Sequence, residues 1–215
     1  MIASRFEAGY VAEALQRRLS APIKRVSKRF RFVPQLGYGR HRGPAPPGTR
    51  SAAVVVLLYP RAEGWFIPFT LRPQTLSVHA GQISLPGGAS EAGESDEQCG
   101  LRELEEEIGI PADQVSILGQ LSPIYVYRSQ FLVQPLVAIA RQTLQFCPDC
   151  AEVEQLLEVP VDQLVDASNY GHMWIARNLL CYQTPCFRHE DHRIWGATLK
   201  VVGEFLDSAF DIFGS

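Results

Sequence analysis

The sequence has 215 residues, of which 46% are hydrophobic and 20% charged, and its formal net charge is −3. This length can bury one full hydrophobic core with an extra terminal element, and the composition is ordinary for a soluble globular protein. The longest apolar run, Ala52–Tyr59, is far too short to cross a bilayer, so no membrane span is expected.

The first fifty residues carry most of the cationic side chains. Within them, Glu7–Leu19 has apolar residues at helical spacing and predicts an amphipathic helix. Lys24–Phe32 is cationic without a clear period, and Gly37–Gly48, with its three Pro and four Gly, predicts a loop or linker. This basic segment could bind nucleic acid, a membrane surface or a phosphorylated small molecule. Alternatively, it could pack on the rest of the chain, which is acidic. We therefore expect a basic N-terminal helix and linker at 1–49 and one larger domain at 50–215.

The larger domain mixes strand and helix signals. Ser51–Tyr59 is a β-branched run typical of a buried central strand, and Trp65–Leu71 predicts a second strand after a short turn. The other expected elements are strands at Val115–Leu121 and Leu132–Ala140, a turn near Pro123, a short helix at Val159–Val165, weak strands at Met173–Ala176 and Leu179–Tyr182, and an amphipathic helix from Trp195 onward. Mixed strands around one long helix, with a second helix at the end, predict an α/β sandwich.

That long helix has clear signals at both ends. Ser95, followed by Gln98 three positions later, predicts a capping box, so the helix should begin at about Asp96. Gly109, followed by a proline, predicts the end of the helix, with the glycine in a left-handed conformation. The apolar residues at helical spacing between these ends are Leu101, Leu104 and Ile108. They predict one buried stripe along the helix.

The same helix is rich in glutamate. At about 100° per residue, Glu103, Glu106 and Glu107 lie on a neighbouring arc, whereas Glu105 points to the far side. Carboxylates this close repel one another unless a cation neutralises them. Oxygen ligands spaced i, i+3 and i+4 suit Mg²⁺ or Mn²⁺, which share their coordination with phosphate. The alternative is an ordinary solvated acidic face.

The surrounding residues decide between these two interpretations. The pattern Gly-x5-Glu-x7-Arg-Glu-Leu-x-Glu-Glu-x-Gly-Ile is filled at every position, by Gly88, Glu94, Arg102, Glu103, Leu104, Glu106, Glu107, Gly109 and Ile110. This pattern resembles the Nudix box, the loop–helix–loop signature of hydrolases that split a diphosphate linked to another moiety. The resemblance covers roughly residues 50–210. It implies a Nudix-type α/β/α sandwich with a mixed sheet, to which this chain adds an N-terminal amphipathic helix.

The resemblance also implies roles for the residues of the box. Glu103 and Glu107 are the leading ligands for Mg²⁺ or Mn²⁺, with Glu106 and Gly88 as further ligands. The metal would neutralise the diphosphate, orient the attacking water and lower its pKa. Arg102 is expected to hold a box carboxylate in place. The general base varies among Nudix enzymes, and both Glu106 and Glu103 remain candidates.

The segment before the box, TLRPQTLSVHAGQISLPGG, resembles the motif of coenzyme A diphosphatases. The matching residues are Thr70, Arg72, His79, Ala80, Gly81, Gln82, Pro86, Gly87 and Gly88. The chain departs from the motif at Leu85, where phenylalanine is usual, at Ser77, often an arginine, and at Pro73, usually a small residue. Two later pieces, Glu152–Pro160 and Trp195–Thr198, resemble the same subfamily.

Arg72, Gly81, Gln82 and Gly87 are the substrate-binding residues that this motif suggests. Glycine lets the backbone approach a diphosphate closely, and arginine can present a guanidinium fork to phosphate oxygens. The alternative role for Arg72 is an ion pair with an acidic neighbour. His79 either orients its loop through a hydrogen bond or contacts the ligand.

The five cysteines form an odd number in a chain without a secretory signal, which argues against a disulfide framework and for a reducing, cytoplasmic compartment. Cys147-Pro-Asp-Cys150 has the form of half a zinc site. Its candidate partners are Cys181, Cys186, His189 and His192, but their spacing fits no standard ligand pair. Thioredoxin-like redox chemistry is not expected either, because no βαβ pattern surrounds this CxxC motif. We therefore expect neither zinc nor redox catalysis.

The expected reaction is hydrolysis of the diphosphate bond of coenzyme A or its thioesters. Its products would be 4′-phosphopantetheine, or the acyl form, and adenosine 3′,5′-bisphosphate. We expect Arg72 and the cationic segment Lys24–Arg31 to bind the 3′-phosphate of coenzyme A, with the larger share for Lys24–Arg31, because Ser77 stands in place of the usual arginine. One alternative is a Nudix diphosphatase for another nucleotide such as ADP-ribose. The other is a non-catalytic Nudix binding module, a class that typically loses the box glutamates kept here. The expected partner is a small molecule and not nucleic acid, with a homodimer left open.

Overall fold

The computed structural model describes residues 7–20, 32, 45–75, 80–177 and 180–214, and all structural statements concern these residues. The helices are α1 (Ala8–Leu19), α2 (Asp96–Ile108), α3 (Val161–Val165) and α4 (Gly196–Phe213). The strands are β1 (Arg50–Arg61), β2 (Gly64–Leu71), β3 (Ile83–Ser84), β4 (Gly87–Ala89), β5 (Val115–Gln120), β6 (Ile124–Val126), β7 (Phe131–Ala140), β8 (Gln155–Pro160), β9 (Tyr170–Arg177), β10 (Leu180–His189) and β11 (His192–Trp195). None of the described helices is long and apolar enough to cross a membrane.

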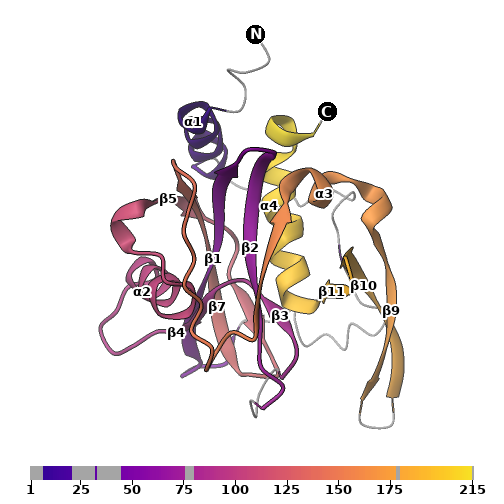
Figure 1. Ribbon diagram of the computed structural model, residues 1–215. Helices are drawn as coiled ribbons and strands as arrows, with labels where there is room; N and C mark the ends of the chain where they lie inside the picture. Colours follow the sequence, from indigo (N-terminus) through magenta and orange to yellow (C-terminus); the bar gives the residue numbers. More distant parts are fainter. Residues whose placement is uncertain (1–6, 21–31, 33–44, 76–79, 178–179, 215) are drawn as a thin grey trace.

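Strand β1 is the centre of a mixed sheet with the order β3-β2-β1-β7-β5. It runs parallel to β7 over most of its length and pairs antiparallel with β4 at one end and with β2 at the other. Strands β6 and β8 add to the sheet through β7 and β2. A second, antiparallel sheet has the order β11-β10-β9 and stands beside the first (Figure 1).

Both faces of β1 are covered, which explains its continuous apolar sequence. Ala53, Val55 and Leu57 pack into one core cluster with Leu104 and Ile108 of α2. The alternate residues of β1 belong to a second cluster, which contains the apolar side chains of α4 and α1. Figure 1 accordingly shows α2 and α4 on opposite sides of the sheet. The molecule is therefore a layered α/β structure.

Helix α1 packs directly onto the larger domain. Val11 and Leu15 are fully buried in the same core cluster as the apolar face of α4. Burial of a side chain of this size contributes roughly 1.5–3 kcal/mol. Arg18 of α1 also forms an ion pair with Asp211 of α4, although both side chains are exposed. The segment that links α1 to β1 lies mostly outside the described residues.

Most of the expected elements are confirmed, and one boundary is wrong. The predicted helix Val159–Val165 is in fact a strand followed by a helix, because β8 extends to Pro160 and pairs antiparallel with β2. Leu157 and Val159 alternate into the core along β8, and α3 begins only at Val161. The short strands β3, β4, β6 and β11 were not predicted. Two to four residues carry too little periodicity to be recognised without their partner strands.

Gly109 provides a test of the local geometry that ends α2. Its φ is +71°, and a Cβ there would lie 2.8 Å from Cβ of Cys147 and 3.0 Å from that residue's carbonyl oxygen. Gly93 is the matched control, because its φ is +82° and a Cβ at that position would have no other atom within 4 Å. We expect Gly93→Ala to destabilise the protein by about 1 kcal/mol and Gly109→Ala by more, since only the latter adds a steric contact to the left-handed strain. Urea unfolding measures the free energy of unfolding of both variants. Equal losses of stability in the two would contradict the close contact between Gly109 and Cys147.

Candidate active site

Helix α2 begins at the predicted capping box. The N–H of Gln98 donates to Oγ of Ser95 at 3.2 Å, and the N–H of Ser95 donates to Oε1 of Gln98 at 2.9 Å. Two of the backbone donors that a helix leaves unpaired at its start are therefore satisfied. This cap fixes the start of the helix, and so determines which glutamates face the sheet.

The end of α2 is held by a segment that is distant in the sequence. Gly109 adopts the predicted left-handed conformation. The N–H of Cys147 donates to the carbonyl oxygen of Ile108, and the N–H of Asp149 donates to that of Glu107, each at 3.0 Å. The Cys147–Cys150 segment therefore caps the C-terminus of this helix through its backbone. Among the described residues, no group of three or more His, Cys, Asp or Glu side chains is arranged to hold a metal ion.

An open cavity of about 470 Å³ lies where α2, β4 and the end of β2 meet. Its lining residues are Arg72, Gly87, Gly88, Ala89, Ser90, Glu91, Arg102, Glu103, Glu106, Glu107 and Glu152. The structure thus brings together all the predicted catalytic and metal-binding residues of the box, and two of the four predicted substrate-binding residues, Arg72 and Gly87. Gly81 and Gln82 do not line this cavity.

Arg102 joins the helix to the loop before it. Its guanidinium donates to both carboxylate oxygens of Glu94, at 2.9 and 3.1 Å, and to the carbonyl oxygen of Ala89 at 3.0 Å. It also donates to Glu103 at 2.8 Å and to Glu106 at 2.7 Å. These bonds raise the pKa of Arg102 and lower that of Glu94, because each charge is stabilised by its partner. Arg102 is therefore a positioning residue that holds the box carboxylates and the loop together.

Glu107 is a carboxylate held almost out of contact with water. Only 2% of its side chain is exposed, and burial raises its pKa to about 7. The N–H of Gly87 donates to its Oε2 at 3.1 Å, and a guanidinium nitrogen of Arg72 lies 3.6 Å from its Oε1. These contacts lower the pKa, whereas the neighbouring charges of Glu103 and Glu152 raise it further. The negative charge of Glu107 is therefore incompletely neutralised.

Glu103 lies against the backbone of β4. A Cβ at Gly88 would come within 2.4 Å of a carboxylate oxygen of Glu103, so only glycine permits this approach. Burial raises the pKa of Glu103, although the Arg102 ion pair opposes this shift. Glu106 is exposed and Glu105 lies on the far, exposed side, as predicted. The two buried carboxylates, and not the whole acidic run, therefore form the floor of the cavity.

The donor set fits a hard divalent cation. Two buried carboxylates with raised pKa values lie beside a glycine backbone, and a cation there would relieve the charge that burial leaves uncompensated. In this structure Arg102 bridges Glu103 and Glu106 instead, so the three glutamates are not gathered around one point. Glu103 and Glu107 are the ligands that this arrangement favours.

Gly81 and Gln82 position Arg72 instead of lining the cavity. The N–H of Arg72 donates to the carbonyl oxygen of Gln82, and the N–H of Gly81 donates to the carbonyl oxygen of Arg72, each at 3.0 Å. Arg72 has the ion pair proposed as its alternative role, with Glu107, yet its buried Nε has no hydrogen-bond partner among the described residues. Ser77 and His79 of the same loop lie outside the described residues.

Glu152 was not predicted as a site residue. It lies just after the segment that caps α2, and its N–H donates to the carbonyl oxygen of Asp149 at 3.0 Å. The exposed carboxylate of Glu152 therefore lines the cavity, although it lies 45 positions after Glu107 in the sequence. The only sequence signal was its place at the start of the Glu152–Pro160 element, which gave no indication that it faces the box.

Comparison with known proteins identifies similar chains. A family model described as the NUDIX domain matches residues 48–180. The chain is 32% identical over 165 residues to an uncharacterised Nudix hydrolase, NudL, of Photorhabdus laumondii, covering 74% of this chain and 87% of that one. It is 34% identical over 152 residues to NudL of Yersinia enterocolitica, covering 70% of this chain and 77% of that one. Neither name states a substrate.

Solved structures show the same architecture. A Nudix hydrolase from M. smegmatis, RenU, matches with a TM-score of 0.54 and 19% identity, covering 81% of this chain and 93% of that one. A MutT/nudix family protein from Enterococcus faecalis matches with a TM-score of 0.51 and 15% identity, covering 81% and 67%. At these identities the likeness concerns the fold alone. The predicted α/β fold with a mixed sheet and an N-terminal helix is confirmed.

The raised pKa of Glu107 predicts a pH dependence of stability in chelator-treated protein. The folded protein holds this proton up to about pH 7, whereas the ordinary value is 4.5. The contribution of the group to stability is therefore complete below the unfolded pKa and is lost as the pH rises through about 7. The loss is on the order of 3 kcal/mol. In urea unfolding with EDTA at pH 5 and pH 8, Glu107→Gln should lack this loss and exceed the wild type at pH 8. An unchanged pH dependence in the variant would contradict the assignment.

Proposed function

The chain belongs to the Nudix hydrolase family, a family of diphosphatases, and from this premise we propose that it hydrolyses the diphosphate bond of coenzyme A or its thioesters. The products would be 4′-phosphopantetheine, or its acyl form, and adenosine 3′,5′-bisphosphate. The observation that carries the proposal is the cavity in which Glu103 and Glu107 lie beside Gly87, Gly88 and Arg72. The choice of substrate is supported by the motif before the box.

Each residue of the cavity has a proposed task. Glu103 and Glu107 hold Mg²⁺ or Mn²⁺, with the backbone of Gly88 and the carboxylate of Glu106 as further ligands. When bound, the cation supplies a Lewis acid that neutralises diphosphate charge and lowers the pKa of the attacking water. Glycines at 87 and 88 allow the diphosphate to approach the backbone closely.

Arg72 is proposed to bind the diphosphate itself. Its guanidinium shares the cavity with Glu107, and its Nε has no hydrogen-bond partner among the described residues. A buried donor without a partner is costly, so a ligand oxygen that accepts from it would be favourable. Gly81 and Gln82 contribute indirectly, through the backbone hydrogen bonds that fix Arg72.

The proton of the attacking water needs an acceptor. Glu103 and Glu106 remain the candidates within the box, although the guanidinium of Arg102 already donates hydrogen bonds to both carboxylates. Glu152 enters the cavity from a different segment and is exposed, with no arginine partner among the described residues. We therefore add Glu152 to the candidates for the general base.

Two alternatives differ in what they require. A Nudix diphosphatase for another nucleotide, such as ADP-ribose, would use the same cavity but not the coenzyme A motif around Arg72 and Gly81. A binding module without activity would not need Arg102 to hold Glu94, Glu103 and Glu106 in place. The intact ion-pair network of the box therefore favours an enzyme.

The metal role of Glu107 is tested together with the substrate. Purified protein with Mg²⁺ or Mn²⁺ is assayed against coenzyme A, ADP-ribose, NADH and nucleoside triphosphates, and the products are identified by mass. We expect coenzyme A to be the preferred substrate and Glu107→Gln to lose on the order of 10²-fold or more in kcat, since an amide is a weaker, uncharged ligand. Glu105→Gln, on the exposed far side of α2, is the matched control and should be near neutral. Equal losses in the two variants would refute the assignment of the metal face.

The role of Glu152 is tested by kinetics. Glu152→Gln should lower kcat by roughly 10²-fold, the range of a general base, with little change in KM. The fold of this variant should be unaffected, because the Glu152 side chain is exposed. The neighbouring Glu154→Gln, also exposed, serves as the control and should keep the wild-type kcat. A Glu152→Gln variant with the wild-type kcat would rule out this base.

A further inference from the structure

Arg50, the first residue of β1, is an exposed arginine that lies over an aromatic ring. Its guanidinium carbon lies 4.2 Å from the centre of the Phe131 ring, and the two residues are partners in the parallel ladder of β1 and β7. Arg50 has no hydrogen bond or ion pair with the described residues, so its N–H donors are available. A guanidinium stacked on an aromatic ring has restricted motion while its edges remain free for acceptors.

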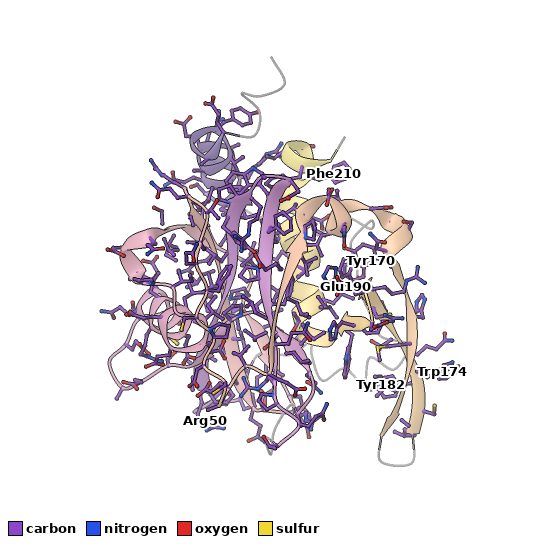
Figure 2. The ribbon with its side chains drawn as sticks, viewed as in Figure 1. Arg50, Tyr170, Trp174, Tyr182, Glu190 and Phe210 are labelled. Atoms are coloured by element: carbon purple, nitrogen blue, oxygen red, sulfur yellow. The ribbon has the colours of Figure 1, made fainter. Side chains whose placement is uncertain are left out.

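The pairing of β1 with β4 brings the backbone of Arg50 near residues that line the cavity. In the register of β1 with β4, Ala52 is opposite Ala89, and the N–H of Ser90 donates to the carbonyl oxygen of Ser51 at 3.0 Å. Ala89 and Ser90 line the cavity, and their partners on β1 are Ala52 and Ser51. Arg50 directly precedes Ser51 in the chain. Figure 2 shows Arg50 at the end of the sheet where β1 and β4 lie together in Figure 1.

Strand alternation places Arg50 on the sheet face opposite α2. Val56 and Leu58, at even positions like Arg50, pack into the cluster of α4, whereas Val55 and Leu57 pack against α2. Strand β4 has only three residues and pairs with β1 alone among the described strands. A ligand over Gly87–Ser90 would have to extend past the edge of this short strand to contact Arg50.

Both arginines that line the cavity already have a role. Arg102 donates to Glu94, Glu103 and Glu106, and Arg72, beside Glu107, is proposed to bind the diphosphate. A substrate that carries negative charge beyond its diphosphate needs a further cation outside this network. Arg50 is such a cation, and Phe131 adds an aromatic surface of the kind on which nucleobases stack.

We propose that Arg50, stacked on Phe131, binds the phosphorylated nucleoside end of the substrate. The ligand chemistry is a nucleoside phosphomonoester, which in coenzyme A is the adenosine 3′-phosphate, so the inference rests on the proposed function and specifies its recognition. The expectation that Lys24–Arg31 contributes to binding this group stays a prediction, because that segment lies outside the described residues. Arg72 is assigned to the diphosphate.

The test compares coenzyme A with dephospho-coenzyme A, which lacks the 3′-phosphate. Arg50→Gln should raise the KM for coenzyme A about tenfold, leave the KM for dephospho-coenzyme A unchanged, and leave kcat unchanged for both. Phe131→Leu should raise both KM values, because stacking of the base does not depend on the phosphate. The control is Arg141→Gln, an exposed arginine just beyond the other end of β7, which should change neither value.

Direct binding separates this inference from the proposed function. Calorimetry in EDTA should show that adenosine 3′,5′-bisphosphate binds wild type about tenfold more tightly than 5′-AMP does, and that Arg50→Gln removes this difference. Equal binding of the two nucleotides to wild type, or an unchanged preference in Arg50→Gln, overturns the role of Arg50. Failure of the wild type to hydrolyse coenzyme A overturns the proposed function, whatever the calorimetry shows.

Discussion

The structure of the site depends on the packing of α2 against glycine backbone. A Cβ at Gly88 would collide with the carboxylate of Glu103, and a Cβ at Gly100 would lie 2.7 Å from Leu136 and 2.9 Å from Val55. The absence of side chains at these positions lets the helix approach β4, β1 and β7 closely. This approach removes two carboxylates from water, which raises their pKa values and leaves charge to be neutralised by something other than solvent.

The other residues of the site neutralise the charge of the two buried carboxylates only in part. Arg102 pairs with Glu103 and Glu106 of the helix and, through Glu94, fixes the loop that precedes it. Glu107, deeper in the cavity, has only one backbone N–H and a more distant arginine. A buried charge that is incompletely paired costs stability, and such groups cluster at functional sites. In a diphosphatase this residual charge is where a divalent cation would bind.

The cavity is assembled by segments from three parts of the chain. Helix α2 supplies the box glutamates, the end of β2 supplies Arg72, and the segment that caps α2 supplies Glu152. The Cys147–Glu152 segment therefore both caps α2 through its backbone and places the carboxylate of Glu152 in the cavity lining. The pair of Arg50 and Phe131, which the ladder of β1 and β7 brings together, lies near this cavity in the chain order of β1.

The local pattern of the sequence is enough to predict helix α2 with its cap and its end, the central strands, and the arc of the helix that carries Glu103, Glu106 and Glu107. It also indicates the family, through nine filled positions of one motif. The burial of Glu103 and Glu107 and the exposure of Glu106 become visible only in the folded chain. The same is true of the backbone hydrogen bonds that join Arg72 to Gly81 and Gln82, and of the place of Glu152 in the cavity. These features depend on contacts between residues far apart in the chain, such as the ladder that brings Arg50 to Phe131, and no local pattern records them.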